Sequence, residues 1–370
     1  MKKLMLTTAI ASVLTTAAIA QTTVTGELRI SYKDVSASRG LANSGSAAAP
    51  ASDTSYGFGA EQQINIQTKG KLNIGGLDYA AGFSMENDGE QTGTLFNENV
   101  YMDLSNAASG TTISIGRDHI QRSDSDFSAT NLVGFTPNEL SQTTNATAGG
   151  TWFNQNLGPA ASQAYGVALI QKTPVGSFSY NWVPNNAKPA TFTTAAEIVA
   201  GANVQGVASS EAVNPNTTAA YEYGFVGDLT VKGLQVHYFK SANEDLAITY
   251  ANAATSAEAK NYGVRYNFGA FTAGANKKIY NAEALNTAVV ETTETAYAIA
   301  YAVNKDLSIG VIKAKADQST SGIDHTVKGI NLGYNLGPVA LAAGYAKNSD
   351  AQGNTGADND VFMIRLLGAF

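Results

Sequence analysis

The side chains that could do chemistry in this chain are charged, and they fall into two sets. One set is mainly acidic and lies in a single long polar segment, whereas the other is basic and lies at polar positions in or at the end of alternating segments. Opposed charges at the narrowest point of an aqueous passage create a transverse field that orders water, disfavours apolar solutes and discriminates ions by sign. If the fold keeps the two sets apart, each residue is only a solvated charge. The first set is Asp118, Arg122, Asp124, Asp126 and Glu139, and the second is Arg29, Lys69, Arg117, Arg265 and Arg365.

Other kinds of chemistry have little support. The histidines His119, His237 and His325 stand far apart without the spacing of metal ligands, and the chain has no cysteine. No serine, histidine and supporting polar residue form a recognisable hydrolytic set. The Asp-rich stretch from Ser349 to Asp360 offers carboxylates for calcium, but the EF-hand spacing is absent and acidic loop residues are usually solvated. We therefore expect no enzyme activity and no cofactor, with loop-bound calcium as the open alternative.

The first twenty residues have the features of a secretory signal peptide. Lys2 and Lys3 form a basic start, an apolar to weakly polar region follows, and Ala18-Ile19-Ala20 is a small-residue cleavage site. A membrane-anchoring helix is the alternative, but threonines and a serine dilute the segment, which is shorter than the ~20 apolar residues of a span. We expect residues 1–20 to be removed and residues 21–370 to form the mature protein.

The composition of the mature chain favours strands with two unlike faces. The formal charge is −7, or −9 without Lys2 and Lys3, and this acidic balance argues against nucleic-acid binding, which needs a basic surface. The 17 tyrosines and 14 phenylalanines coexist with a mean hydropathy of −0.11, as expected when apolar and polar faces average out. No later stretch approaches ~18 consecutive apolar residues, so any membrane role must come from strands.

Apolar and polar residues alternate in blocks of about ten residues along the whole mature chain. In an early block, Leu28, Ile30 and Tyr32 alternate with polar residues, which gives one face suited to lipid and one suited to water. We count sixteen blocks, and an even number lets the first and last strands pair and leave no open edge in lipid. The sequence therefore predicts one domain, a 16-stranded antiparallel transmembrane β-barrel over residues 21–370. The same alternation places Arg29, Lys69, Arg265 and Arg365 on the wall of the lumen, and Arg117 lies at the end of its strand.

The connections between the blocks alternate in length. Long polar connections follow the odd-numbered blocks, and the third of these, Asp118 to Ala160, is the longest. Short turns at one end and long loops at the other are typical of outer-membrane barrels, whose short turns face the periplasm. The short connections carry Gly, Asn, Asp and Pro, which tolerate tight turns, and span residues 70–76, 106–110, 174–176, 227–233, 269–270, 304–306 and 335–338.

Three stretches resemble proteins of the Gram-negative outer membrane. The end, Val361 to Phe370, resembles the last strand of outer-membrane proteins, so Phe370 is expected to be the signal for the barrel-assembly machinery. The stretch TISIGRD at residues 112–118 resembles the strand before the constriction loop of the general-diffusion porin family, and the opening at residues 23–29 extends the similarity over the mature chain. The resemblance implies a trimeric 16-stranded porin whose third long loop folds into the lumen and narrows it. The acidic constriction motif of the family is not reproduced letter for letter.

The pattern and the resemblance together predict a general-diffusion porin of the cell outer membrane that passes ions and small hydrophilic solutes. Its expected partners are outer-membrane lipids, two further copies in a homotrimer, and the barrel-assembly machinery. One alternative is a substrate-specific porin, which a ladder of inward aromatic residues would mark, whereas inward positions here are mainly Gln, Asn, Ser, Gly and charges. The other is a secreted all-β adhesin, which should be soluble without detergent. The sequence leaves pore radius, ion preference, native solutes and trimer interface open.

Overall fold

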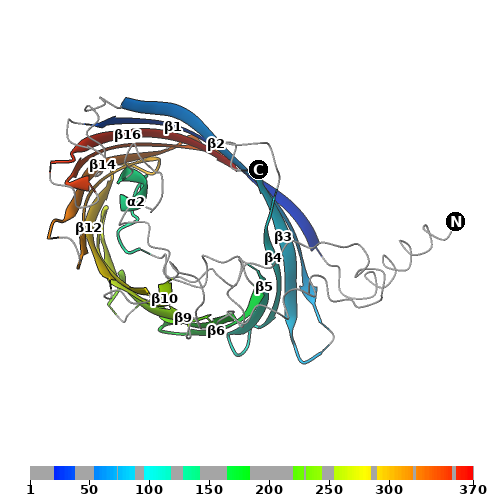
Figure 1. Ribbon diagram of the computed structural model, residues 1–370. Helices are drawn as coiled ribbons and strands as arrows, with labels where there is room; N and C mark the ends of the chain where they lie inside the picture. Colours follow the sequence, from blue (N-terminus) through cyan, green and yellow to red (C-terminus); the bar gives the residue numbers. More distant parts are fainter. Residues whose placement is uncertain are drawn as a thin grey trace, which may run out of the picture.

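The computed structural model describes the strands, the short turns and one internal segment of the chain (Figure 1). The expected signal peptide and Phe370 lie outside the described residues, so both stay predictions. Within the described part, no helix is long and apolar enough to cross a membrane. The described residues are 21–37, 54–72, 74–87, 96–117, 128–141, 165–183, 220–228, 231–243, 254–284, 290–319, 322–351 and 356–369.

Sixteen antiparallel strands close into one barrel, which confirms the predicted fold class and strand count (Figure 1). Each strand pairs with its neighbours in the sequence, and β1 closes the ring by pairing with β16. The strands are β1 (Gln21–Ala37), β2 (Thr54–Lys71), β3 (Asp78–Asn87), β4 (Phe96–Asn106), β5 (Thr111–Arg117), β6 (Tyr165–Thr173), β7 (Gly176–Val183), β8 (Ala220–Asp228), β9 (Leu234–Asn243), β10 (Ala254–Phe268), β11 (Phe271–Ala284), β12 (Val290–Ala302), β13 (Leu307–Gln318), β14 (His325–Asn335), β15 (Val339–Ser349) and β16 (Asn359–Ala369).

The closing seam runs along the whole length of β16. Its register places Glu27 opposite Ala369 at one end and Ala37 opposite Asn359 at the other. Because every strand then has a partner on both edges, the backbone N–H and C=O groups along the sheet are satisfied without water. This closure is what allows the sheet to stand in hydrocarbon.

Side chains alternate between the two faces of the wall as the sequence pattern predicts. On β12, Tyr297, Ile299 and Tyr301 are exposed on the outside, whereas Ala298 and Ala300 between them are buried. The same alternation runs through β13 to β16, where the outward apolar residues are exposed and the inward residues are mostly buried. The exposed apolar side chains therefore form the surface that lipid would cover.

All seven predicted short connections join consecutive strands, and in the fully described ones the turn residues explain the shape. Between β4 and β5, the Asn106 side-chain oxygen accepts hydrogen bonds from the N–H groups of Ala108 and Ser109 at 3.0 and 3.1 Å. Gly110 follows with φ of 69°, and Gly269 in the two-residue turn between β10 and β11 has φ of 64°. Glycine adopts this left-handed conformation without the steric cost that a Cβ atom brings.

The main cluster of buried apolar side chains lies on the inner face of the wall. Phe135 and Leu140 come from the connection between β5 and β6, which also contains the single-turn helix α2 (Pro137–Leu140). These two large side chains pack against mostly smaller inward residues of β12 to β16 and β1. The apolar packing on the inner face is therefore concentrated on one side of the ring. The other members of the cluster are Val35, Ala296, Ala298, Ile312, Ala314, Ala316, Val327, Ala346, Val361 and Met363.

An introduced charge tests whether the outer face of β12 lies in the bilayer. Ile299 lies in the middle of the outward apolar run of β12 and is 51% exposed. We expect Ile299→Arg to lower the free energy of unfolding in lipid vesicles by about 2–4 kcal/mol, because a guanidinium group is costly in hydrocarbon. Thr295→Arg, at an outward position nearer the long-loop end, should cost about 0–1 kcal/mol. Equal losses in denaturant titrations of the two variants would contradict the placement of Ile299 in the bilayer.

Candidate functional site

Part of the long connection between β5 and β6 lies against the inner face of the barrel. Residues 128–141 are described from this connection, and α2 within them contacts β13, β14, β15 and β16 (Figure 1). A reciprocal cap explains why one helical turn forms here. The Glu139 N–H donates to the Thr136 hydroxyl at 3.2 Å, and the Thr136 N–H donates to the Glu139 carboxylate at 2.8 Å. Pro137 at the start of the turn supplies a preset φ.

Arg365 and Glu139, two of the predicted site residues, meet at the inner wall. The Arg365 Nη2 group donates to Glu139 Oε1 in an ion pair, while the other carboxylate oxygen of Glu139 serves the helix cap. The Arg365 guanidinium carbon also lies 4.7 Å from the centroid of the Phe135 ring, within the range of a cation–π contact. Both charged side chains are only 18% and 25% exposed, so water screens this pair less than a surface pair. Arg365 thereby fixes the helix and its apolar anchor together.

Arg265 holds the beginning of the same segment. Its Nε group donates to the carbonyl oxygen of Ala129 at 3.2 Å, and its Nη2 group donates to the carbonyl oxygens of Ser128 and Asn131 at 3.0 and 3.2 Å. Hydrogen bonds from a charged donor are stronger than those between neutral groups. The guanidinium of Arg265 therefore fixes a turn of backbone to β10.

Three asparagines on the wall bind the segment's backbone between these two arginines. Asn276 accepts from the Ala129 N–H at 3.2 Å, Asn331 donates to the Phe135 carbonyl at 2.9 Å, and Asn348 donates to the Leu140 carbonyl at 2.9 Å. All three asparagines are buried. Amide side chains can satisfy backbone groups that leave regular structure, and an unpaired buried group would cost about 1–3 kcal/mol.

Glycines give the segment its close fit to the wall. A Cβ atom added at Gly274 would lie 2.0 Å from the carbonyl oxygen of Ala129, and one added at Gly344 would lie 2.5 Å from the Phe135 ring. A Cβ at Gly329 would meet Leu140 at 3.0 Å. Any larger residue at these inward positions would therefore push the segment away from the wall.

The other predicted basic residues lie elsewhere on the wall. Arg29 donates from Nη2 to Glu27 at 2.9 Å and from Nη1 to Glu61, so its ion-pair partners belong to β1 and β2 rather than to the segment. Lys69 is exposed near the short-turn end of β2. It shares the inward parity of Gln67, whose amide donates to the hydroxyl of the inward Tyr101.

The structure does not describe the side chains of the remaining predicted site residues. The register of β5 places the backbone of Arg117 opposite Val100 at the end of the strand. The side chain of Arg117 lies outside the described part of the structure, so its place on the lumen wall stays a prediction. The loop residues Asp118, Arg122, Asp124 and Asp126 lie outside the described residues, and their place at a constriction stays a prediction.

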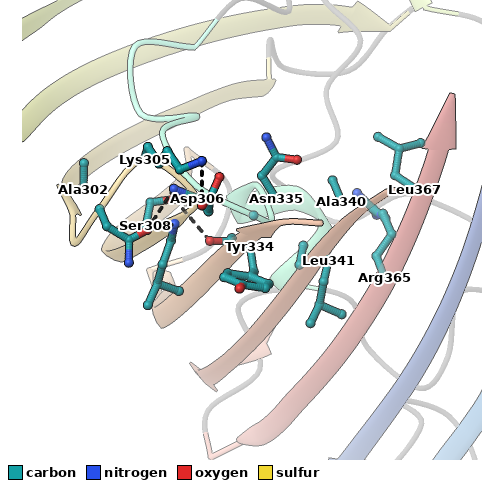
Figure 2. Close-up of a pocket in the computed structure, with 15 residues that line it drawn as sticks. Ala302, Lys305, Asp306, Ser308, Tyr334, Asn335, Ala340, Leu341, Arg365 and Leu367 are labelled. Atoms are coloured by element: carbon teal, nitrogen blue, oxygen red, sulfur yellow. Dashed lines mark hydrogen bonds and ion pairs between the residues drawn. The ribbon is translucent and has the colours of Figure 1, made fainter. Parts of the chain in front are cut away.

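The inner wall is hollowed between the segment and the short-turn end of β12 to β16. The hollow has a volume of about 460 Å³ and is bordered by Gly134 on the segment side. Figure 2 shows Arg365 and Asn335 among the residues around it, with Lys305 and Asp306 at the turn between β12 and β13. The Lys305 Nζ and Asp306 Oδ2 atoms are 3.6 Å apart. Its lining combines charged and amide side chains with small apolar groups.

A metal centre has no support among the described residues. Within them, no three His, Asp or Glu side chains are grouped to hold an ion. In the connection between β15 and β16, the Asp350 carboxylate accepts from the Gly356 N–H at 2.7 Å, and the Asp358 carboxylate accepts from the Asp350 N–H at 3.1 Å. These two carboxylates of the suggested calcium stretch therefore stabilise a turn.

Comparison with known proteins identifies the family. Residues 7–364 match the family model described as Gram-negative porin. The chain belongs to this family. No protein among the curated sequences matches it. The family match covers nearly the whole chain and agrees with the closed barrel of the structure.

Solved porin structures share the fold at low sequence identity. The anion-selective porin from Comamonas acidovorans is 14% identical with a TM-score of 0.61, and the comparison covers 95% of this chain and 100% of that one. A loop-deletion mutant of OmpT, an outer membrane protein of Vibrio cholerae, is 14% identical with a TM-score of 0.61 and coverage of 95% and 99%. A mutant of Rhodopseudomonas blastica porin is 14% identical with a TM-score of 0.55 and coverage of 95% and 100%. As a member of the porin family, the protein forms a channel in the outer membrane.

Sequence reasoning named Glu139, Arg265 and Arg365, which the structure places at the segment, but missed the neutral residues that hold it. The signal was present on β11, β14 and β15, where the inward asparagines Asn276, Asn331 and Asn348 each have a glycine or alanine at the neighbouring inward position. Small residues at successive inward positions indicate that something packs closely on that part of the wall. The strand sequences alone do not indicate which segment of the chain packs there.

Filling one glycine position tests whether the segment depends on this fit. We expect Gly344→Val to displace Phe135, because even the first added carbon would overlap its ring. The displaced segment should become sensitive to limited proteolysis, and the single-channel conductance in planar bilayers should change. Gly368→Val is the matched control, since a Cβ there meets nothing within 4 Å. Identical digestion and conductance in the two variants would contradict the close packing of Phe135 against Gly344.

The strength of the contact between Glu139 and Arg365 can be measured with a double-mutant cycle. Glu139→Gln, Arg365→Gln and the double variant should give a coupling free energy of about 0.5–3 kcal/mol in unfolding titrations, as for residues in direct contact. The exposed pair Lys305 and Asp306 serves as the control and should give a coupling near zero. Similar coupling in both cycles would show that Arg365 does not anchor the helix through Glu139.

Proposed function

We propose that this porin is a general-diffusion channel for ions and small hydrophilic solutes. The observation that carries the proposal is the segment 128–141, which charged and amide side chains of the lumen hold against one side of the wall. A segment in this position reduces the open cross-section of the barrel and places fixed charges beside the path of solutes. Such a passage filters by size and charge without a binding site for one substrate.

The inward side chains favour general diffusion over a substrate-specific porin. Among the strand residues whose side chains the structure describes, the inward aromatics are Tyr101, Phe239 and Tyr280, which lie on β4, β9 and β11. They do not follow one another along neighbouring strands, so they do not form a ladder for sugar rings. The closed barrel and the family also leave the secreted adhesin without support.

The protein acts without catalysis and without a cofactor in this proposal. The buried histidines His237 and His325 are each hydrogen-bonded to asparagine, at 3.1 and 3.2 Å, within the inner wall. Their neighbours are consistent with structural roles. A channel that lowers a permeability barrier needs no reacting group, so the fixed charges of the lumen are sufficient for its work.

Oligomeric state and membrane partners complete the proposal. A structure of Vibrio cholerae OmpT with 12% identity to this chain is described as a trimer form, and we infer a homotrimer here as well. Outer-membrane lipids would cover the exposed apolar residues of the outer face. The terminal Phe370 is the proposed signal for the barrel-assembly machinery.

Fixed charges beside the passage are proposed to set ion preference. Glu139 and the predicted loop residues Asp118, Asp124 and Asp126 would supply negative charge, with Arg122 among them, and Arg265 and Arg365 would supply positive charge. Neutralising the side chains of one charge leaves an excess of the opposite charge along the path of the ion. The direction of the resulting change in selectivity does not depend on the preference of the native channel.

Reversal potentials in planar bilayers test this assignment. We expect combined neutralisation of Asp124, Asp126 and Glu139 to shift the permeability ratio toward anions, and Arg265→Gln with Arg365→Gln to shift it toward cations. A charge at contact distance in water is worth about 1 kcal/mol, so each neutralisation should change the ratio by roughly fivefold at most. Asp317→Asn on the outer face of β13 is the control and should leave the ratio unchanged. An unchanged reversal potential in both lumen variants would overturn the proposal.

A further inference from the structure

Three lysines form a row on the outer face of the barrel. Lys313 on β13 is the register partner of Lys328 on β14, and Lys328 is the register partner of Lys347 on β15. All three are exposed, and they share the outward parity of the apolar residues on these strands. We call Lys313, Lys328 and Lys347 the lysine row.

The register places the lysine row at the border of the apolar belt. Two positions nearer the short-turn end, Val311, Ile330 and Tyr345 are paired in the same order, and they are 54%, 54% and 37% exposed. Two positions nearer the long-loop end, the partners of Lys315 are polar, first Thr326 and then Ser349. The row therefore lies where the hydrocarbon ends and the headgroup layer of the outer leaflet begins.

Two of the three lysines, Lys313 and Lys328, have no carboxylate among their register partners. No ion pair or hydrogen bond joins any of the three lysine side chains to the described part of the chain. The nearest acidic register partner is Asp360 beside Lys347, and its carboxylate accepts a hydrogen bond from the Tyr345 hydroxyl. Like charges directly opposite each other on adjacent strands destabilise a sheet, so this arrangement costs free energy unless an anion lies against it.

Another lysine pair on the same face shows how such a cost is offset elsewhere. Lys240 and Lys260 are also register partners on β9 and β10. Glu258 lies between them, with its carboxylate oxygens 2.7 Å from each Nζ atom. The protein thus supplies an internal anion between the two lysines of this pair, whereas the lysine row has only Asp360, beside Lys347 at one end of the row.

We propose that the lysine row binds the phosphate groups of a lipid in the outer leaflet. Adjacent strands are about 4.8 Å apart, so the three ammonium groups span roughly 10 Å, a distance that the headgroup of one lipid with two phosphates covers. The apolar row beneath offers exposed surface for the acyl chains of the same molecule. A phosphate in solution would meet the ammonium groups but gain nothing from that apolar surface.

Native mass spectrometry of the detergent-solubilised full chain tests the site, with diphosphorylated lipid A as probe. The wild-type protein should retain lipid A in preference to phosphatidylcholine. The triple variant Lys313→Gln, Lys328→Gln and Lys347→Gln should bind lipid A roughly 100-fold more weakly, about fivefold for each lysine. Lys305→Gln, in the short turn at the opposite end and 90% exposed, is the control and should bind as the wild type does. Lys328→Gln alone should show the single fivefold loss if the triple variant folds poorly.

Two results would overturn the proposal. One is equal retention of lipid A by the wild type and by the variants that fold, as judged by heat-modifiable gel migration. The other is displacement of lipid A by millimolar inorganic phosphate, which would indicate a site for the ion alone. Single-channel conductance and reversal potential should be the same in the wild type and the triple variant, because the lysine row lies outside the lumen. This readout keeps the lipid site separate from the selectivity proposal.

Discussion

The rest of the structure depends on the need of backbone N–H and C=O groups for partners in a medium that contains no water. A sheet meets this need only when it closes, and the pairing of β1 with β16 closes this one. Closure gives every strand an inner and an outer face, and the period of two along the strand then decides which side chain meets lipid. The lipid face is therefore apolar by necessity, whereas the inner face is free to vary in character around the ring.

The inner face uses that freedom unequally. On β11 to β16 it carries glycine, alanine and asparagine, and these residues accept segment 128–141 as a packed layer. The apolar anchor residues Phe135 and Leu140 are buried there as they would be in a water-soluble domain. Because the packing is tight and the backbone groups of the segment are bound by wall side chains, the segment holds a defined position beside the aqueous path. A channel with fixed dimensions requires this kind of rigidity.

Charge is distributed by the same geometry. In the lumen, Arg365 and Arg29 stand with carboxylates, and Arg265 binds carbonyl oxygens, so each guanidinium is held in place rather than free to follow passing ions. On the outer face, lysines occur where the apolar belt ends. The barrel thus presents organised charge to solutes on the inside and to the headgroup layer on the outside, and the two sets are separated by the thickness of one sheet.

The sequence by itself determined the number of strands, the positions of the seven short turns, the alternation of faces along the strands and the inward position of Arg29, Arg265 and Arg365. These features depend on local alternation and turn chemistry, which each segment carries within itself. Only the tertiary structure decided that Arg365 meets Glu139 across 226 positions and that Gly344 seats Phe135. It also decided that Lys313, Lys328 and Lys347 stand side by side. Parity assigns a residue to a face, but the register between strands and the path of a long connection decide its neighbours, and both depend on the closure of the whole ring.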